Sequence, residues 1–273
     1  MNEGGGGSRV ISALICVLLA GCAGSGSTTF IPDGGVQDGG GGGPDAGDAG
    51  GAAAVWFRRD GGVKIMPLGD SITEGAQAEQ GGYRWPLEDL LVDAGYDFDY
   101  VGSLRVGSPP GMPRPWHEGH GGYAIESADG GHQLAGAVVD SALRTYQPDV
   151  ILLLAGTNNL NFPDTLDPDK TSAMYDRLLA QIFSTSPNVG VVASPVPWKT
   201  AVPSDQVAAF NQRIGAIVDR YADAGYRVTW VAGMTDAIDG GVENLPDGIH
   251  PSQPAYGRMA EEWFESLQAI SGP

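Results

Sequence analysis

From residue 55 onward, short apolar runs alternate with stretches in which apolar residues recur every three or four positions. The short runs predict β-strands, and DVILLLAG is apolar throughout, as expected of a strand that is buried on both faces. The longer stretches predict amphipathic helices. The predicted strands cover residues 64–68, 97–103, 149–156, 188–194 and 226–232. The predicted helices cover residues 84–94, 131–146, 171–183, 204–224 and 252–270.

This alternation of strand and helix predicts one α/β domain over residues 56–273. The connections are long enough to return the chain to the same end of the sheet, so neighbouring strands can run parallel. We therefore expect a three-layer α/β/α sandwich with a central, mostly parallel, flavodoxin-like sheet. Ligands of such sheets bind at the carboxyl ends of the strands, so the loops that follow the strands are where chemistry is expected.

Residues 1–21 have the layout of a secretory signal peptide, in which Arg9 precedes a short apolar run closed by small residues. The end of that run, LLAGC, resembles the lipobox of bacterial lipoproteins, whose cysteine is lipidated after cleavage just before it. The resemblance implies a lipid anchor at Cys22 and a place in the bacterial cell envelope, with Cys16 leaving in the signal. A plain signal peptide, which would leave the protein secreted, and a membrane helix with a chance cysteine are the alternatives.

Residues 22–55 are rich in Gly and Asp and contain few large apolar side chains, which predicts a flexible linker that cannot bury a core. Gly-x-Gly-x-x-Gly matches in this segment follow no strand and precede no helix, which argues against a dinucleotide site. The formal net charge of −18 argues against a nucleic-acid partner, because phosphate binding needs clustered Lys and Arg. We expect a monomer.

Polar clusters occur where the predicted sheet would place a site: GDS, HEGHGGYAI and GTNNL after strands, and PDGIHPS before the last helix. Ser71 in the first cluster has two interpretations. Ser71-x-x-Glu74 fits the helix capping box, but Ser71 also stands where the end of a strand would present a nucleophile. A serine hydrolase needs such a hydroxyl, an imidazole that accepts its proton, an acid that orients the imidazole, and donors for the oxyanion.

The four clusters contain residues of each required type. His250 is the best proton acceptor, because Asp247 stands three residues before it and can share its loop. The backbone N–H groups of Ser71 and Gly122 and the side-chain amide of Asn158 are candidate oxyanion donors. The domain contains no Gly-x-Ser-x-Gly elbow, so the α/β-hydrolase fold is not supported.

The blocks GDSITEG, HGG, GTNN and DGIH resemble, in order and spacing, those of the GDSL, or SGNH, hydrolases, over nearly the whole chain from residue 64. The resemblance implies the SGNH fold, a catalytic triad of Ser71, Asp247 and His250, and an oxyanion hole of Ser71, Gly122 and Asn158. The stretches IMPLGDSITEG, DYVGS and HEGHGGYAI look more narrowly like carbohydrate esterase family 3, whose members include acetyl xylan esterases. That narrower resemblance implies deacetylation of a xylan-like polysaccharide without a cofactor.

Two positions depart from the pattern of that family. The third block often reads Gly-x-Asn-Asp, but Asn159 replaces the Asp here, and Gly121 stands where Ser is common in the second block. We expect activity to survive, with a looser loop at Gly121. Two alternatives stay open: a lipase or lysophospholipase type of esterase that acts on longer acyl esters, and a non-catalytic carbohydrate-binding surface lipoprotein. Asn159 is the only feature that hints at a decayed site.

A metal site is the other interpretation of the second cluster. His-Glu-x-x-His on a helix would place two imidazoles on one face, but HEGH has a different spacing and lies in a glycine-rich loop. We therefore expect no metal, and we assign these residues to shaping the loop that carries the candidate oxyanion donor. The residues concerned are His117, Glu118, His120 and His132.

Three further residues lie beside the expected site. Tyr123 and Trp198 are candidates for lining a sugar-binding cleft, because aromatic faces suit pyranose rings, although packing is an equally good explanation. Asp70 precedes Ser71, and neighbours in an extended or turning chain usually point in different directions. We expect Asp70 to brace the loop and not to be the triad acid.

Overall fold

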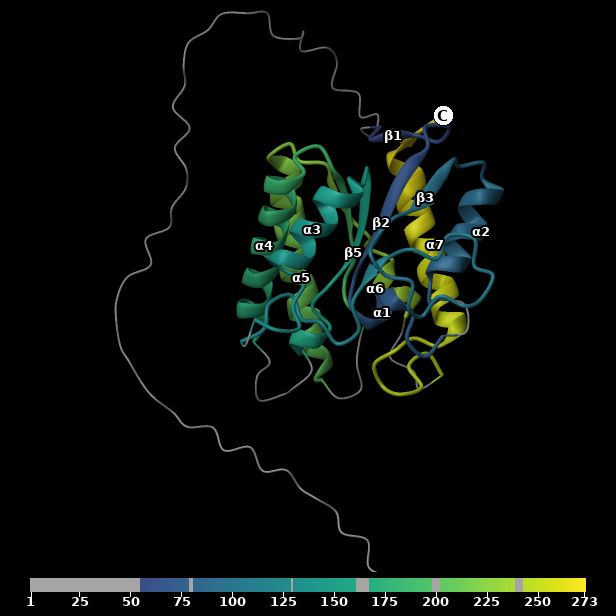
Figure 1. Ribbon diagram of the computed structural model, residues 1–273. Coiled ribbons are helices and arrows are strands. Elements are labelled where there is room, and N and C mark those ends of the chain that lie inside the picture. Colours follow the sequence, from purple (N-terminus) through teal and green to yellow (C-terminus); the bar gives the residue numbers. More distant parts are fainter. Residues whose placement is uncertain (1–54, 79–80, 129, 161–166, 198–201, 239–242) are drawn as a thin grey trace, which may run out of the picture. The chain divides into compact units, whose positions relative to one another are not determined.

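The computed structural model describes residues 55–78, 81–128, 130–160, 167–197, 202–238 and 243–273 (Figure 1). The predicted signal peptide and nearly all of the predicted linker lie outside these ranges, including Cys16 and Cys22, and so does Trp198. Within the described part of the chain, no helix is both long and apolar enough to cross a membrane.

The central sheet is parallel, with its strands in the order β3-β2-β5-β6-β7 and the short β4 paired with the end of β2. Apart from β4, this is the 2-1-3-4-5 order of flavodoxin-like sheets, so the predicted fold class is confirmed. Every residue of β5 is buried, as its unbroken apolar run predicts. The strands are β2 (Val63–Gly69), β3 (Phe98–Tyr100), β4 (Glu118–Gly119), β5 (Val150–Leu154), β6 (Gly190–Ala193) and β7 (Val228–Trp230).

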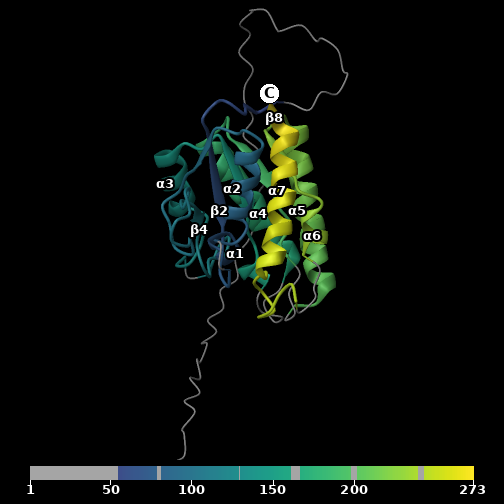
Figure 2. The ribbon, with the colours of Figure 1, turned by 90° about the vertical axis from the view of Figure 1, so that its right-hand side faces the viewer.

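Helices cover both faces of this sheet (Figures 1 and 2). Helices α3, α4 and α5 pack side by side on one face, and α2 packs against α7 on the other. The long helices are α2 (Arg84–Asp93), α3 (Ala137–Tyr146), α4 (Pro168–Thr185), α5 (Ser204–Asp223) and α7 (Gln253–Ile270). The short ones are α1 (Ser71–Glu74), the 3-10 turn η1 (Asn158–Leu160) and α6 (Met234–Ala237).

The prediction of a helix from residue 131 is wrong for its first six positions, because α3 begins only at Ala137. The backbone of Leu134 donates to the carbonyl of Ala124 across 2.9 Å, and that of Ala135 donates to Ile125 across 3.0 Å. These hydrogen bonds tie the segment to the preceding loop in bends and a turn, so the spacing of Leu134 resembles a helical face although no helix forms there. A second difference is the pairing of β1 (Phe57–Arg58) with β8 (Ser271–Gly272), which is too short to leave a sequence pattern.

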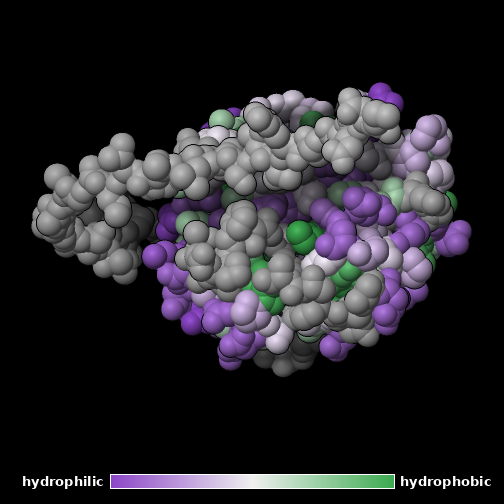
Figure 3. All heavy atoms as spheres, turned by 90° about the horizontal axis from the view of Figure 1, so that it is seen from below, coloured by the Kyte–Doolittle hydropathy of each residue, from purple (hydrophilic) through white to green (hydrophobic). Residues whose placement is uncertain are grey.

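The order of the strands turns at β2, since β3 lies on one side of it while β5, β6 and β7 follow on the other. A crevice forms at the carboxyl ends of the strands at such a switch point. Ser71 follows β2, and Asn158 follows β5, so the fold brings two of the sequence-predicted site residues to this end of the sheet. Figure 3 views the molecule from that end, where apolar side chains lie among polar ones.

Candidate active site

Ser71 is the first residue of α1, immediately beyond β2. Asp70, which is fully buried, caps this helix by accepting a hydrogen bond from the backbone N–H of Ile72 across 3.0 Å. The capping-box interpretation of Ser71 is therefore wrong, because the cap is Asp70. At Gly69 an added Cβ would overlap the carbonyl oxygen of Leu154, so glycine is required at this last register pair of β2 and β5.

The structure brings Ser71, His250 and Asp247 into one line of contacts. Nε2 of His250 lies 2.8 Å from Oγ of Ser71, and Nδ1 lies 2.7 Å from Oδ2 of Asp247. The imidazole is mostly shielded, with 18% of its side chain exposed. Ser71 and His250 are 179 positions apart in the chain, so only the folded sheet, with α7 packed across it, creates this contact.

Asp247 is fixed by the turn that it starts. Its Oδ1 accepts hydrogen bonds from the backbone N–H groups of Ile249 across 3.0 Å and of His250 across 2.7 Å. Gly248 permits the turn with a φ of 82°, which disfavours other residues. Partial burial by itself would raise the pKa of Asp247, but hydrogen bonds from the backbone and ring of His250 outweigh it and hold that pKa below its usual range.

The loop after β4 carries Gly122 to the same end of the sheet. Gly119 pairs with Gly69 in the last register position of β2, and the N–H of His120 donates to the carbonyl of Gly69 across 2.9 Å. Gly122 follows with a φ of 78°, the left-handed region in which glycine is favoured. The backbone that presents Gly122 is thus tied to the strand that presents Ser71.

Asn158 and Asn159 open η1, the next element after β5. The side-chain amide of Asn158 donates to the carbonyl of Tyr123 across 2.8 Å. The neighbouring Asn159 accepts from the backbone N–H of Ile125 across 2.8 Å and donates to the carbonyl of Glu126 across 3.1 Å. Both asparagines therefore bind the loop that carries the other candidate oxyanion donor.

His117 is part of the packing and not a free ligand. It is fully buried, its Nε2 lies 2.7 Å from the carbonyl oxygen of Val106, and its Nδ1 accepts from the N–H of Gly119 across 3.0 Å. Burial, followed by the nearby charge of Arg84, lowers the pKa of His117 to about 3. The imidazole is therefore neutral at physiological pH, with both ring nitrogens in use.

The remaining residues of that cluster form separate contacts. Glu118 accepts from His120 Nε2 across 2.8 Å, and the ring of His120 lies 4.8 Å from that of Tyr123. The ring of Tyr123 also contacts the ring of His132, with the two centroids 5.3 Å apart. These imidazole contacts correspond to the packing interpretation of Tyr123. No cluster of three or more metal-ligating side chains occurs among the residues that the structure describes.

Arg84 is a residue that the sequence analysis missed. It is fully buried, and its guanidinium donates to the carbonyls of Thr73 across 3.0 Å and Glu74 across 2.9 Å, at the end of the helix that Ser71 begins. Burial lowers the pKa of Arg84 to about 10, so it stays charged at neutral pH. In the sequence, an arginine at the start of an amphipathic helix looks like a solvent-exposed one, and no sequence signal indicates that Arg84 is buried.

Comparison with known sequences identifies related proteins. The pattern of the GDSL-like Lipase/Acylhydrolase family matches residues 68–258. A multidomain esterase of Ruminococcus flavefaciens is 30% identical over 238 residues, which are 78% of this chain and 30% of that protein. The chain thus spans less than a third of this curated relative.

Solved structures of similar fold include two carbohydrate esterases. The family 3 carbohydrate esterase of Clostridium thermocellum is 32% identical, with a TM-score of 0.64 over 77% of this chain and 99% of that one. A family 3 carbohydrate esterase from Talaromyces cellulolyticus is 24% identical, with a TM-score of 0.61 over 76% of this chain and 98% of that one. At this lower identity, the second likeness concerns the fold alone.

Proposed function

Because the chain belongs to the GDSL-like Lipase/Acylhydrolase family, we propose that it is an esterase in which Ser71, His250 and Asp247 form the catalytic triad. One observation carries the proposal: a single imidazole, that of His250, lies 2.8 Å from the Ser71 hydroxyl and 2.7 Å from the Asp247 carboxylate. A hydroxyl, an imidazole and a carboxylate in this order are what nucleophilic acyl transfer requires.

The proton moves along this line of contacts. As Oγ of Ser71 attacks the ester carbonyl carbon, Nε2 of His250 accepts the hydroxyl proton. Asp247 accepts a hydrogen bond from the Nδ1–H, which selects the tautomer with a lone pair on Nε2 and stabilises the imidazolium. The imidazolium then protonates the departing alcohol. Water attacks the acyl-enzyme and gives its proton to His250, and the acid leaves as Ser71 recovers a proton.

Three donors are proposed for the oxyanion: the N–H groups of Ser71 and Gly122 and the amide of Asn158. The N–H of Ser71 stands at the first position of α1, where a helix offers no backbone acceptor to it. The φ of 78° at Gly122 and the placement of Asn158 at the start of η1, the next element after β5, support their roles. Loss of one such donor slows comparable acyl transfers by about 10²–10³-fold.

We propose an acetylated carbohydrate, of the xylan type, as the substrate. Support comes from the 32% identity to a family 3 carbohydrate esterase, 99% of which this chain covers, and from the 30% identity to a multidomain esterase. The proposed acyl group is acetyl, and no step of the mechanism requires a cofactor. Tyr123 stays a candidate for contact with sugar, and Trp198 lies outside the described residues.

The decisive experiment compares wild type with Ser71→Ala on p-nitrophenyl acetate and on acetylated xylan, mannan, chitin and peptidoglycan. We expect Ser71→Ala to abolish acetate release, while Ser141→Ala, at an exposed position of α3, retains the wild-type rate. Wild-type turnover by Ser71→Ala would overturn the mechanism. Acetate release from another polymer in preference to xylan would redirect the choice of substrate.

Two rival functions predict different results in the same assays. A lipase-like member of the family would hydrolyse an octanoyl ester faster than an acetyl ester. A carbohydrate-binding lipoprotein would bind acetylated xylan without releasing acetate. Acetyl preference together with turnover excludes both.

The proposed location is the bacterial cell envelope, with a lipid anchor at Cys22, because the sequence LLAGC that ends at this cysteine resembles a lipobox. Cys22→Ala should move the protein from the membrane fraction to the soluble fraction. Cys16→Ala is the matched control, because this cysteine would leave with the signal and its loss should change nothing. Membrane association of Cys22→Ala would contradict the anchor.

A further inference from the structure

We propose that Asn159 is a positioning residue, whose side-chain amide holds the loop of Gly122 in register with Asn158 so that both proposed oxyanion donors face one point. The inference rests on the proposed function of Ser71 and adds a residue to it. It gives a reason for the departure at this position, where Asp is common in the resembling family, and it opposes the interpretation of Asn159 as a sign of decay.

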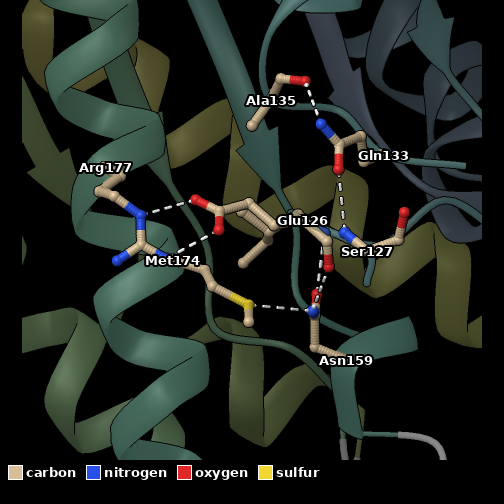
Figure 4. Close-up of polar contacts among 8 residues, drawn as sticks. Glu126, Ser127, Gln133, Ala135, Asn159, Met174 and Arg177 are labelled. Atoms are coloured by element: carbon tan, nitrogen blue, oxygen red, sulfur yellow. Dashed lines mark hydrogen bonds and ion pairs between the residues drawn. The ribbon is translucent and has the colours of Figure 1, made fainter. Parts of the chain in front are cut away.

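The contacts of Asn159 use both ends of its amide (Figure 4). Its Oδ1 accepts from the N–H of Ile125 across 2.8 Å, and its Nδ2 donates to the carbonyl of Glu126 across 3.1 Å. Nδ2 also lies 3.4 Å from the sulfur of Met174 on α4. The side chain therefore contacts two consecutive residues of the loop, accepting from the N–H of Ile125 and donating to the carbonyl of Glu126.

The neighbouring Asn158 binds the same loop two residues earlier. Its amide donates across 2.8 Å to the carbonyl of Tyr123, the residue directly after Gly122. Two consecutive residues of η1 thus fix the loop at three peptide groups, from Tyr123 to Glu126. Since η1 itself follows β5, this arrangement sets the position of Gly122 relative to the strand end that presents Asn158.

Only an amide satisfies both partners of Asn159 at neutral pH. A carboxylate at this position accepts from the N–H of Ile125 but has no donor for the carbonyl of Glu126, and its charge repels that oxygen. A protonated carboxylic acid restores the donor. An Asp side chain at position 159 would therefore hold the loop in its acid form and release it in its ionised form.

The charged groups around position 159 are already paired with one another. Arg177 of α4 donates to both carboxylate oxygens of Glu126 across 2.7 Å. Ser127 continues the loop, and its N–H donates to Oε1 of Gln133 across 3.0 Å. In Figure 4 Arg177 contacts the carboxylate of Glu126, whereas Asn159 contacts the backbone carbonyl of that residue, so the guanidinium does not substitute for the amide.

The test compares Asn159→Asp with wild type on p-nitrophenyl acetate over a range of pH. We expect kcat of Asn159→Asp at pH 8 to fall about tenfold with KM nearly unchanged, since a misplaced oxyanion donor affects the transition state more than the bound ester. We also expect the ratio of the variant kcat to the wild-type kcat to rise as pH falls, because protonation of the introduced carboxylate restores the bond to Glu126. Asn159→Ala should lower kcat with a ratio that is independent of pH.

Gln181→Glu is the matched control. Gln181 grips both polar groups of one residue in the same way, accepting from the N–H of Gly136 across 2.9 Å and donating to its carbonyl across 2.8 Å, but it holds the start of α3 and no residue of the proposed oxyanion hole. Its change to Glu should lower thermal stability and leave kcat per folded molecule at the wild-type value. Active-site titration corrects each kcat for the folded fraction.

The outcomes separate the two proposals. Turnover in wild type and its absence in Ser71→Ala establish the proposed function, and absence of turnover in wild type overturns both proposals. Given turnover, a kcat and pH profile of Asn159→Asp equal to those of wild type overturns the role of Asn159. A loss of kcat in Asn159→Asp that does not change with pH also overturns it, because the hydrogen bond from Nδ2 of Asn159 to the carbonyl of Glu126 would then not be the cause of the loss.

Discussion

The carboxylate of Glu74 lies where a side chain at position 121 would begin, so that a Cβ on Gly121 would overlap Oε2 of Glu74. Glu74 ends the helix that Ser71 starts, and Gly121 adjoins the proposed oxyanion donor Gly122. The two proposed halves of the site therefore meet through this pair. The expected looseness of the loop at Gly121 is thus accompanied by a close approach that glycine alone allows without rearrangement.

We predict that Gly119→Ala harms the enzyme far more than Gly121→Ala. A Cβ at Gly121 meets the free end of a flexible side chain, which can swing away, whereas a Cβ at Gly119 would lie 2.5 Å from the backbone nitrogen of Glu74, which cannot. Gly121→Ala should retain most of its kcat and unfold near the wild-type temperature. Gly119→Ala should lose about 1–3 kcal/mol of unfolding free energy and most of its kcat. Equal effects in urea unfolding and in p-nitrophenyl acetate turnover would contradict this account of the α1–β4 contact.

Asp247→Asn should lower kcat by about 10²–10⁴-fold while KM changes little. The Asn side chain can present a donor to Nδ1 of His250, which favours the tautomer that lacks a lone pair on Nε2. Because hydrogen bonds hold the pKa of Asp247 below its usual range, the wild-type carboxylate stays ionised throughout the assay, from pH 5 to 9. The loss should therefore be the same across this range, and a loss confined to low pH would argue against the assigned role. Asp236→Asn, which alters an exposed residue of α6, serves as the control.

His117 should make the fold sensitive to acid. Its pKa is lowered to about 3 in the folded protein, while the unfolded chain takes up a proton near the ordinary value of 6.5. Between these values the unfolded state binds more protons, so the free energy of unfolding decreases as pH falls below 6.5, by up to about 1.4 kcal/mol per pH unit. Above pH 6.5 His117 is neutral in both the folded and the unfolded state, so its titration no longer lowers the free energy of unfolding.

His117→Gln tests this dependence. The variant should be less stable than wild type at pH 7.5, because it breaks the contacts with Val106 and Gly119. Its free energy of unfolding should nevertheless depend less on pH between 4 and 6.5, as measured by urea titration at several pH values. His132→Gln, which alters an exposed imidazole, should keep the wild-type slope. Identical slopes for wild type and His117→Gln would show that another group causes the acid sensitivity.

The alternation of apolar runs was sufficient to predict the parallel sheet, because β5 and the amphipathic helices have patterns that local sequence determines. It failed where long-range contacts decide the backbone. The Leu134 segment is held out of the helix by hydrogen bonds to Ala124 and Ile125, and a periodicity of four carries no information about these partners. The cap of α1 is another case: Ser71 and Asp70 are both good capping residues, and only the folded turn distinguishes them.

The residues of the site likewise include some that were predictable from the sequence and some that were not. The sequence suggested Ser71, Asp247 and His250 because their chemistry is recognisable in short motifs, and the structure brings these residues together. The structural roles of Asn159 and Arg84 were not predictable from local patterns. Asn159 acts on peptides about 34 positions away, and Arg84 supports a helix end that is 10 positions earlier. Such contacts depend on the path of the loops, which composition and spacing do not specify.

Arg84 is the clearest case for experiment, because it joins the helix of Ser71 to the rest of the fold. Its guanidinium donates to the carbonyls of Thr73 and Glu74, which α1 leaves without helical partners, and to the hydroxyl of Ser108 across 2.9 Å. Arg84→Met keeps most of the volume but leaves these buried carbonyls unpaired. We expect a loss of about 2–4 kcal/mol in the free energy of unfolding, since each unsatisfied buried group costs about 1–3 kcal/mol.

If Arg84→Met affected only stability, its kcat per folded molecule would not change. Measuring both the free energy of unfolding and kcat therefore separates stability from the positioning of Ser71. Arg84→Lys places one charged group where the fork of Arg spans two carbonyls, and it should recover part of the stability but little of the kcat. Arg114→Met is the matched control, because Arg114 binds Glu88 across 2.9 Å and the carbonyl of Phe98, which belong to α2 and β3 and not to α1. Its loss should lower stability and leave kcat unchanged. If Arg84→Met and Arg114→Met both retain the wild-type kcat, the end of α1 does not need Arg84 to hold the nucleophile in place.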